Sequence, residues 1–149
     1  MRSLLTKLSV WFYLWQLKPW YGYERVPVKL LYAQAYHETG GFESPIFKEN
    51  KNIFGMKLPR KRKTYAKGEN RGHATYNSVK DSIRDYFLRQ SNFGIVDVAD
   101  ADNYMIQTVN SNYAEDPNYY AKWMALYNKI KGLSPNGFLL IGLFFWDFS

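Results

Sequence analysis

LLYAQAYHETGGFESPIFKENKNIFGMK, at residues 30–57, is the stretch that decides the fold. Its first part predicts a helix that ends at Glu38, followed by a glycine turn at Gly40–Gly41 and a loop that closes on residues 52–55. One face of the helix is mostly small or apolar, with residues at spacings of three, four and seven. That face is made of Leu31, Gln34, Ala35 and Glu38.

Glu38 is the candidate catalytic residue of this helix. Partial desolvation favours the neutral form of a carboxylate, and so does a place in the last helical turn, at the negative end of the helix dipole. Both effects suit a general acid that works near neutral pH. The alternative for a glutamate in a last turn is a solvated residue without a catalytic role.

Several short motifs follow one another along the chain. They are AQA at 33–35, ETG at 38–40 with a serine at 44, NIFGMK at 52–57, YNS at 76–78 with SIRD at 82–85, and YAEDP at 113–117 with YYA at 119–121. Together and in this order they resemble the glucosaminidase family of peptidoglycan hydrolases, which includes endo-β-N-acetylglucosaminidases of flagellar, autolysin and phage type. The resemblance covers about residues 26–131.

The resemblance implies an α+β, mostly helical, lysozyme-like catalytic domain with a small β-hairpin lobe at residues 26–132. An apolar, aromatic helical segment at 1–25 and an apolar tail at 133–149 would flank it. It also implies that Glu38 protonates the glycosidic oxygen. A second acidic residue often comes from the β lobe in this family, and Glu69 matches that placement. The alternatives are that Glu69 only balances charge in a loop and that the substrate's own N-acetyl group assists the reaction.

The same resemblance supplies candidate substrate-binding residues. The family counterpart of Tyr113 reaches the cleft beside the catalytic glutamate, where a phenol would hydrogen-bond the acetamido group of the sugar. Tyr76 corresponds to a position near the cleft, and Phe54 and Asn52 belong to the loop that closes on it. Packing in the core is the alternative for these aromatic side chains. The implied chemistry needs no metal and no cofactor.

Composition narrows the possible functions. The chain of 149 residues is long enough for one domain with a hydrophobic core. Because it lacks cysteine, a disulfide scaffold, a thiolate zinc site and a cysteine nucleophile are excluded. Its two histidines, His37 and His73, are too few for a histidine-built metal centre. The net charge of +7 suits an anionic partner, and bacterial peptidoglycan is the partner that we expect.

The remaining elements follow from local patterns. Residues 64–66 and 74–76 predict the strands of a small β-hairpin lobe with a basic tip, to which the run RKRK at 60–63 contributes. This run is interpreted either as a solvated charged loop or as a surface that attracts an anionic wall polymer. A nucleic-acid patch is the third interpretation, and no nucleic acid is expected. Ser78 predicts the cap of a helix that runs to residue 90. Asp102 predicts the cap of a helix through residue 109, and Asp116-Pro117 the start of a last helix that Gly132 ends.

Both ends of the chain are apolar. Residues 1–23 resemble a signal peptide without its cleavage site, and their spacing favours an amphipathic helix that packs on the domain. A membrane-surface or assembly contact and a cleaved signal peptide are the alternatives for this helix. FLLIGLFFW at 138–146 is too short to span a bilayer. Its interpretations are a buried strand or tail that packs against the N-terminal helix, and an exposed patch for a membrane-surface or assembly contact. We expect a protein that acts at the bacterial cell wall, extracellular or virion-associated. The rival functions are a non-catalytic wall-binding or virion module, a muramidase and a lytic transglycosylase.

Overall fold

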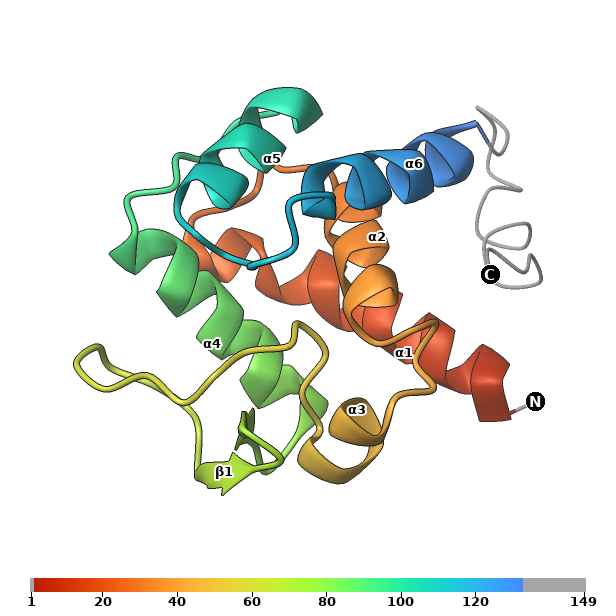
Figure 1. Ribbon diagram of the computed structural model, residues 1–149. Helices are drawn as coiled ribbons and strands as arrows, with labels where there is room; N and C mark the ends of the chain where they lie inside the picture. Colours follow the sequence, from red (N-terminus) through yellow and green to blue (C-terminus); the bar gives the residue numbers. More distant parts are fainter. Residues whose placement is uncertain (1, 133–149) are drawn as a thin grey trace.

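The computed structural model describes residues 2–132, and this part of the chain forms an α+β, mostly helical fold, as predicted. Six α-helices, one 3₁₀ helix and a two-stranded antiparallel sheet follow one another (Figure 1). In chain order they are α1 (Arg2–Leu17), η1 (Pro19–Tyr21), α2 (Val28–Glu38), α3 (Pro45–Asn50), β1 (Gly68–Asn70), β2 (His73–Thr75), α4 (Val79–Asn92), α5 (Ala101–Asn110) and α6 (Tyr119–Lys131).

Helix α2 is the centre of the core. Every residue from Leu30 to Tyr36 is buried, so its apolar character extends around the helix, as expected for a helix enclosed by others. It packs against α6 and α1, and Figure 1 shows it between them. The indole Nε1 of Trp123 on α6 donates a hydrogen bond of 2.9 Å to the carbonyl oxygen of Leu30. The helix that carries Glu38 is therefore held on several sides.

Helix α1 packs on α2 and α4, as the helical spacing of its apolar residues predicted. Its inner face contributes Val10, Leu14 and Leu17 to the core. Its outer face leaves Leu5, Leu8, Phe12 and Trp15 exposed. Within residues 2–132, none of the helices is long and apolar enough to cross a membrane. The predicted apolar tail at 133–149 lies outside the described residues.

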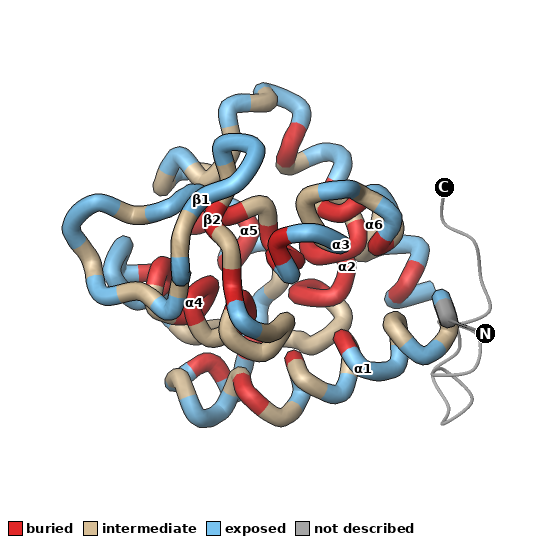
Figure 2. Tube along the Cα trace, turned by 90° about the horizontal axis from the view of Figure 1, so that it is seen from below, coloured by how far each residue is buried: buried red, intermediate tan, exposed pale blue. Residues whose placement is uncertain are grey.

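The β lobe is a short hairpin in which Gly68 pairs with Thr75 and Asn70 with His73. Its strands therefore differ from the predicted ones, and residues 64–66 are not part of the sheet. The reason is Asp85 on α4. Its carboxylate accepts hydrogen bonds from the Thr64 hydroxyl, at 2.7 Å, and from the backbone N–H of Tyr65, at 3.1 Å. In Figure 2 the lobe is mostly exposed, whereas the buried residues concentrate on the helices behind it.

The predicted helix starts are right in one case and wrong in two. Ser78 caps α4, and its hydroxyl accepts a hydrogen bond of 3.1 Å from the backbone N–H of Asp81. The cap of α5 is Asp100 and not Asp102, whose carboxylate instead accepts from the hydroxyl of Tyr120.

Helix α6 starts later than predicted, at Tyr119, because Asp116 and Pro117 form a turn before it. In this turn the carboxylate of Asp116 accepts a hydrogen bond of 2.8 Å from the backbone N–H of Asn118 and pairs with Lys122. The end of α6 is as predicted, since Gly132 is its C-terminal cap.

Candidate active site

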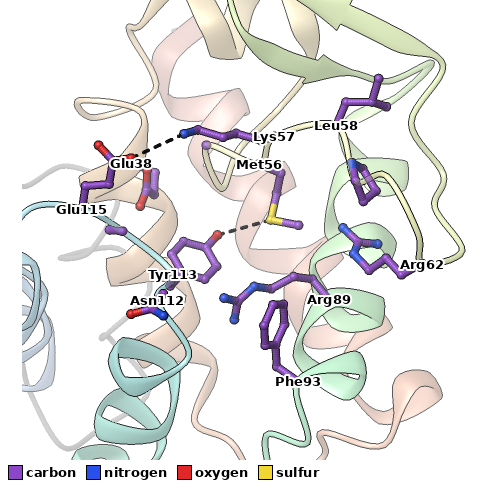
Figure 3. A pocket seen from close by; sticks show the side chains of 13 residues that line it. Glu38, Met56, Lys57, Leu58, Arg62, Arg89, Phe93, Asn112, Tyr113 and Glu115 are labelled. Carbon is purple, nitrogen blue, oxygen red and sulfur yellow. Dashed lines mark hydrogen bonds and ion pairs between the residues drawn. The ribbon is translucent and has the colours of Figure 1, made fainter.

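Glu38 ends α2 at a cavity of about 480 Å³. The walls come from three parts of the chain: the segment after Gly55, helix α4, and the connection between α5 and α6 (Figure 3). The side chains that line it are Glu38, Met56, Lys57, Leu58, Pro59, Arg62, Arg89, Phe93, Asn112, Tyr113, Ala114 and Glu115, together with Gly55. A carboxyl group is thus placed where a ligand in the cavity would meet it.

The environment of Glu38 favours its neutral form. Burial raises the pKa of the Glu38 carboxyl from 4.5 to about 7, and a hydrogen bond from the Tyr119 hydroxyl opposes part of this rise. The physical cause is the loss of water around the charged form. A carboxyl group with a pKa near 7 holds a transferable proton at neutral pH, as a general acid requires.

The loop at residues 52–56 is shaped to admit this carboxyl. Gly55 has a φ of 64°, in the left-handed region that favours glycine. A β-carbon on Gly55 would overlap Glu38 Oε2 and lie 3.2 Å from Glu38 Cδ. Asn52 fixes the loop, because its side chain donates to the carbonyl oxygen of Met56, at 2.8 Å, and accepts from the backbone N–H of the same residue, at 3.1 Å.

Of the four predicted substrate-binding residues, Tyr113 is the one whose side chain lines the cavity. Its hydroxyl donates a hydrogen bond of 2.6 Å to the carbonyl oxygen of Phe54, and the guanidinium of Arg89 lies 4.7 Å from its ring centroid. The side chain of Phe54 is fully buried and stacks on Tyr86 with ring centroids 3.9 Å apart. Phe54 and Asn52 are therefore buried residues of the loop that carries Gly55 and Met56, and their side chains do not line the cavity.

Tyr76 and Glu69 are not among the residues that line this cavity. The Tyr76 side chain is buried, and its hydroxyl donates a hydrogen bond of 2.6 Å to Asp85. Through this bond the Tyr76 side chain connects the β lobe to α4, which is a structural role. Glu69 is exposed on β1, opposite Ala74. Its role as a second carboxylate stays a prediction from the resemblance.

A buried ion pair holds the basic end of the cavity. Arg62 donates two hydrogen bonds to Asp85, at 2.9 and 3.2 Å, and the two side chains are 8% and 0% exposed. Burial alone would raise the pKa of Asp85, but hydrogen bonds from Arg62, Tyr76 and Thr64 bring it below its ordinary value. The basic run at 60–63 is thus divided, because Arg62 is turned inward while Arg60, Lys61 and Lys63 are exposed.

A network of buried hydroxyl and amide groups lies behind Glu38. Gln34 donates to the Tyr119 hydroxyl, at 3.1 Å, and accepts from the Tyr86 hydroxyl, at 2.6 Å. Gln90 extends the network by donating to Tyr104, at 2.8 Å, and to Thr108, at 3.0 Å. The network joins α2, α4, α5 and α6 and positions the Tyr119 hydroxyl that contacts Glu38.

Three residues of the site had no role in the sequence-based prediction: Tyr119, Arg89 and Glu115. Tyr119 and Glu115 lie within matched motifs, so the motifs marked the segments but did not show which side chains face Glu38. Arg89 carries no local signal, because its cavity-facing position depends on how α4 is placed. Within residues 2–132, no group of three or more histidine, aspartate and glutamate side chains is arranged to hold a metal ion.

Comparison with known proteins identifies the family. The family model described as glucosaminidase, mannosyl-glycoprotein endo-β-N-acetylglucosaminidase, matches residues 21–132. The chain belongs to the glucosaminidase family. This glucosaminidase-family chain is also similar to the protein bax of Escherichia coli strain K12, with 34% identity over 61 residues. That match covers 41% of this chain and 22% of the bax protein, so the chain spans about a fifth of that relative.

Solved structures show the same lysozyme-like fold. A chain of a type VI secretion system effector–immunity complex from Pseudomonas protegens has a TM-score of 0.69 at 16% identity, with 89% of this chain and 93% of that chain covered. The truncated glycoside hydrolase domain of FlgJ from Salmonella typhimurium has a TM-score of 0.60 at 27% identity, with 88% of this chain and 97% of that chain covered. The predicted glucosaminidase resemblance and lysozyme-like fold are therefore confirmed.

Proposed function

We propose that the protein is a glycoside hydrolase that cuts the glycan strand of peptidoglycan, with Glu38 as the general acid. The observation that carries this proposal is the position of Glu38, a carboxyl with a pKa of about 7 at the edge of a cavity in a glucosaminidase-family fold. The substrate would be the cell wall, whose anionic groups suit a protein of net charge +7.

In the proposed reaction, Glu38 donates its proton to the glycosidic oxygen. The bond between that oxygen and the anomeric carbon breaks, and its electron pair stays on the leaving oxygen. The sugar left behind resembles an oxocarbenium ion, which a carboxylate or the sugar's own acetamide stabilises until water adds. The geometry behind Glu38 supports this role, because Tyr119 and the loop at Gly55 hold the carboxyl in one place.

The bond that we favour is the one after N-acetylglucosamine, which would make the protein an endo-β-N-acetylglucosaminidase. Family membership supports this choice. The lysozyme-like fold does not decide it, because one fold hosts several related chemistries. Muramidase and lytic transglycosylase activities are the alternatives, and they leave different chemical ends on the product.

Digestion of purified peptidoglycan tests the proposal. Wild type, Glu38→Gln and Glu43→Gln are compared, and the new ends are identified by mass spectrometry after borohydride reduction. Glu43 is an exposed glutamate outside the cavity, paired with Lys48 at 2.9 Å, so its variant controls for the loss of one carboxylate. We expect reduced N-acetylglucosamine ends with wild type and Glu43→Gln and none with Glu38→Gln.

Other products distinguish the rivals. Reduced N-acetylmuramic ends would indicate a muramidase, and anhydro-muramic ends a lytic transglycosylase. Binding to the sacculus without new ends on several wall types would refute the enzyme and leave a non-catalytic module on the same fold.

A further inference from the structure

Phe93 is an aromatic side chain that the cavity of Glu38 leaves open to solvent. Within residues 2–132, the exposed aromatic side chains are Phe12, Trp15, Trp20, Tyr65 and Phe93. Phe93 is the one of this set that lines the cavity, and its side chain is 52% exposed. A single exposed aromatic side chain is common on protein surfaces. Phe93 differs from such residues in the way its ring and its backbone are held.

Arg89 supports the Phe93 ring from one side. Arg89 Cζ lies 4.1 Å from the Phe93 ring centroid and 4.7 Å from the Tyr113 ring centroid, and Figure 3 shows the guanidinium between the two rings. The guanidinium is fixed in turn, because it donates hydrogen bonds to the Gln90 side chain, at 2.8 Å, and to the hydroxyl and carbonyl oxygens of Ser111, at 2.8 and 3.0 Å. These acceptors are all neutral, so attraction to the two ring faces helps to stabilise this buried cation.

The backbone also holds Phe93 in place. Phe93 is the C-terminal cap of α4, and its N–H donates a hydrogen bond of 3.1 Å to the carbonyl oxygen of Arg89. Gly94 follows with a φ of 71°, and it turns the chain away from the helix. A ring with a fixed backbone and one supported face loses little conformational freedom when a ligand packs on its other face.

Phe93 and Glu38 lie at different ends of the cavity. In Figure 3 the side chains of Tyr113 and Arg89 lie between them. The contacts agree with this order, because the Tyr113 hydroxyl bonds to the loop at residues 52–56 that meets Glu38, whereas Arg89 contacts Phe93. A group bound on Phe93 is therefore not the group that Glu38 would protonate, but it can belong to the same bound chain.

We propose that Phe93 is a stacking platform for a pyranose ring of the glycan strand, in a subsite away from the bond that is cut. The inference rests on the proposed glycoside hydrolase function. The sugars of peptidoglycan carry their ring substituents equatorially, so their C–H bonds form apolar faces. The partial positive charge of these C–H bonds suits the negative face of an aromatic ring, and packing removes apolar surface from water. Ligand sites are commonly built from such aromatic walls with few polar groups.

Calorimetric titration of the inactive Glu38→Gln variant measures this subsite without cleavage. The probe is an octasaccharide fraction of peptide-free glycan strands from peptidoglycan. Glu38→Gln is compared with double variants that add Phe93→Ala, Phe93→Tyr or Phe12→Ala. Phe12 is the matched control, because it is 50% exposed on α1 and lies outside the cavity.

We expect Phe93→Ala to raise the Kd for the octasaccharide by about 5–10-fold, the factor for burial of the exposed half of a phenylalanine side chain. Phe93→Tyr keeps the ring and Phe12→Ala leaves the cavity intact, so both should stay within about twofold of Glu38→Gln, a difference of less than 0.5 kcal/mol by the same conversion. An unchanged Kd for Phe93→Ala would overturn the inference, as would an equal loss for Phe12→Ala.

Ring-current shifts give a second readout, which a purely structural role of Phe93 would not produce. The ring C–H protons of one sugar should move upfield in the NMR spectrum when the octasaccharide binds Glu38→Gln. Phe93→Leu keeps an apolar side chain without a ring, so it should keep the melting temperature and lose this upfield shift. Shifts that persist with Phe93→Leu would refute the stacking.

The inference and the proposed function can fail separately. If Phe93→Ala binds the octasaccharide normally while wild type cuts peptidoglycan, the platform is refuted and the proposed function stands. If Phe93→Ala weakens binding but wild type does not cut, the hydrolase is refuted and the platform stands. A wild type that neither binds nor cuts the glycan would refute both.

Discussion

The Glu38 carboxyl lies where a side chain on Gly55 would begin, because a β-carbon on Gly55 would overlap Oε2 of Glu38. The backbone of Gly55 also has a positive φ of 64°. Two separate requirements, one of backbone conformation and one of volume, therefore select glycine beside the Glu38 carboxyl.

Gly55→Ala should lower both stability and activity. Alanine in the left-handed backbone conformation should lower the free energy of unfolding by about 1–2 kcal/mol. The new methyl group must also displace the Glu38 carboxyl. This displacement should reduce activity by about tenfold or more, since small misplacements of catalytic groups are costly. Gly72→Ala is the matched control. Gly72 has a φ of 74°, and a β-carbon on it would have nothing within 4 Å. The Gly72→Ala variant should therefore lose a similar amount of stability and keep its activity. Thermal melts and initial rates measure both, and equal activities would show that the overlap does not matter.

The rate should fall as pH rises through about 7, because the Glu38 carboxyl must be protonated to act as the acid. A pH–rate profile on peptidoglycan measures this alkaline limb. A limb centred near pH 4.5, the ordinary value for this group, would contradict the assignment of a buried acid.

Stability should respond to the same group. The pKa of Glu38 in the folded protein lies above the ordinary value of 4.5. The contribution of Glu38 to the free energy of unfolding is therefore fully present below pH 4.5 and is lost as pH rises to about 7. The full shift corresponds to about 3 kcal/mol at most. Between pH 5 and pH 8, the melting temperature of wild type should therefore fall relative to that of Glu38→Gln. Parallel curves for the two proteins would show that Glu38 titrates alike in the folded and unfolded chains.

Tyr119→Phe should move the alkaline limb to higher pH. The Tyr119 hydroxyl lowers the pKa of Glu38 by hydrogen bonding to it, so its removal leaves burial unopposed and raises that pKa. Stability should fall by about 1–3 kcal/mol, because the buried amide of Gln34 loses an acceptor. Tyr120→Phe, one residue along and outside the cavity, is the control and should leave the limb in place. A downward shift for Tyr119→Phe would reverse the predicted sign.

Asp85→Asn should destabilise the protein by about 3–5 kcal/mol, since it leaves the guanidinium of Arg62 buried without its counter-charge. Because the folded pKa of Asp85 is lowered, this stability is present above the pKa of the unfolded chain and is lost as pH falls through the folded pKa. Urea titrations at several pH values measure the effect. Lys61→Met, an exposed neighbour, should change stability by about 0.5 kcal/mol or less. A loss for Asp85→Asn no larger than that would rule out a role for the pair in stability.

Local rules predicted the helices and the position of Glu38. Helical spacing and the glycine turn place the end of α2 at Glu38, and Ser78 caps α4 as its sequence pattern predicts. Errors arose where a side chain has a distant partner. Asp102 bonds to Tyr120 instead of capping a helix, and Thr64 bonds to Asp85 instead of pairing in a strand.

The site was predictable to the level of segments. Motif matching selected residues 52–57 and 113–117, whose contacts with each other form one side of the cavity. It did not show that Tyr76 is turned to Asp85 or that Glu115 lines the cavity. The packing between helices far apart in sequence decides which side chain of a matched segment faces Glu38. A short motif does not contain information about that packing.

Because Arg62 is turned inward to Asp85, the number of residues in the loop from Met56 to Arg62 is constrained. Asn52 anchors the chain at Met56, and Arg62 anchors it again at Asp85, so an inserted or deleted residue between these points would bring Lys61 or Lys63 to the buried carboxylate. Neither lysine offers the two parallel N–H groups of a guanidinium. Length changes should be tolerated instead at the exposed turn between β1 and β2. A library of loop variants would therefore divide into two classes by position, with the boundary at Arg62.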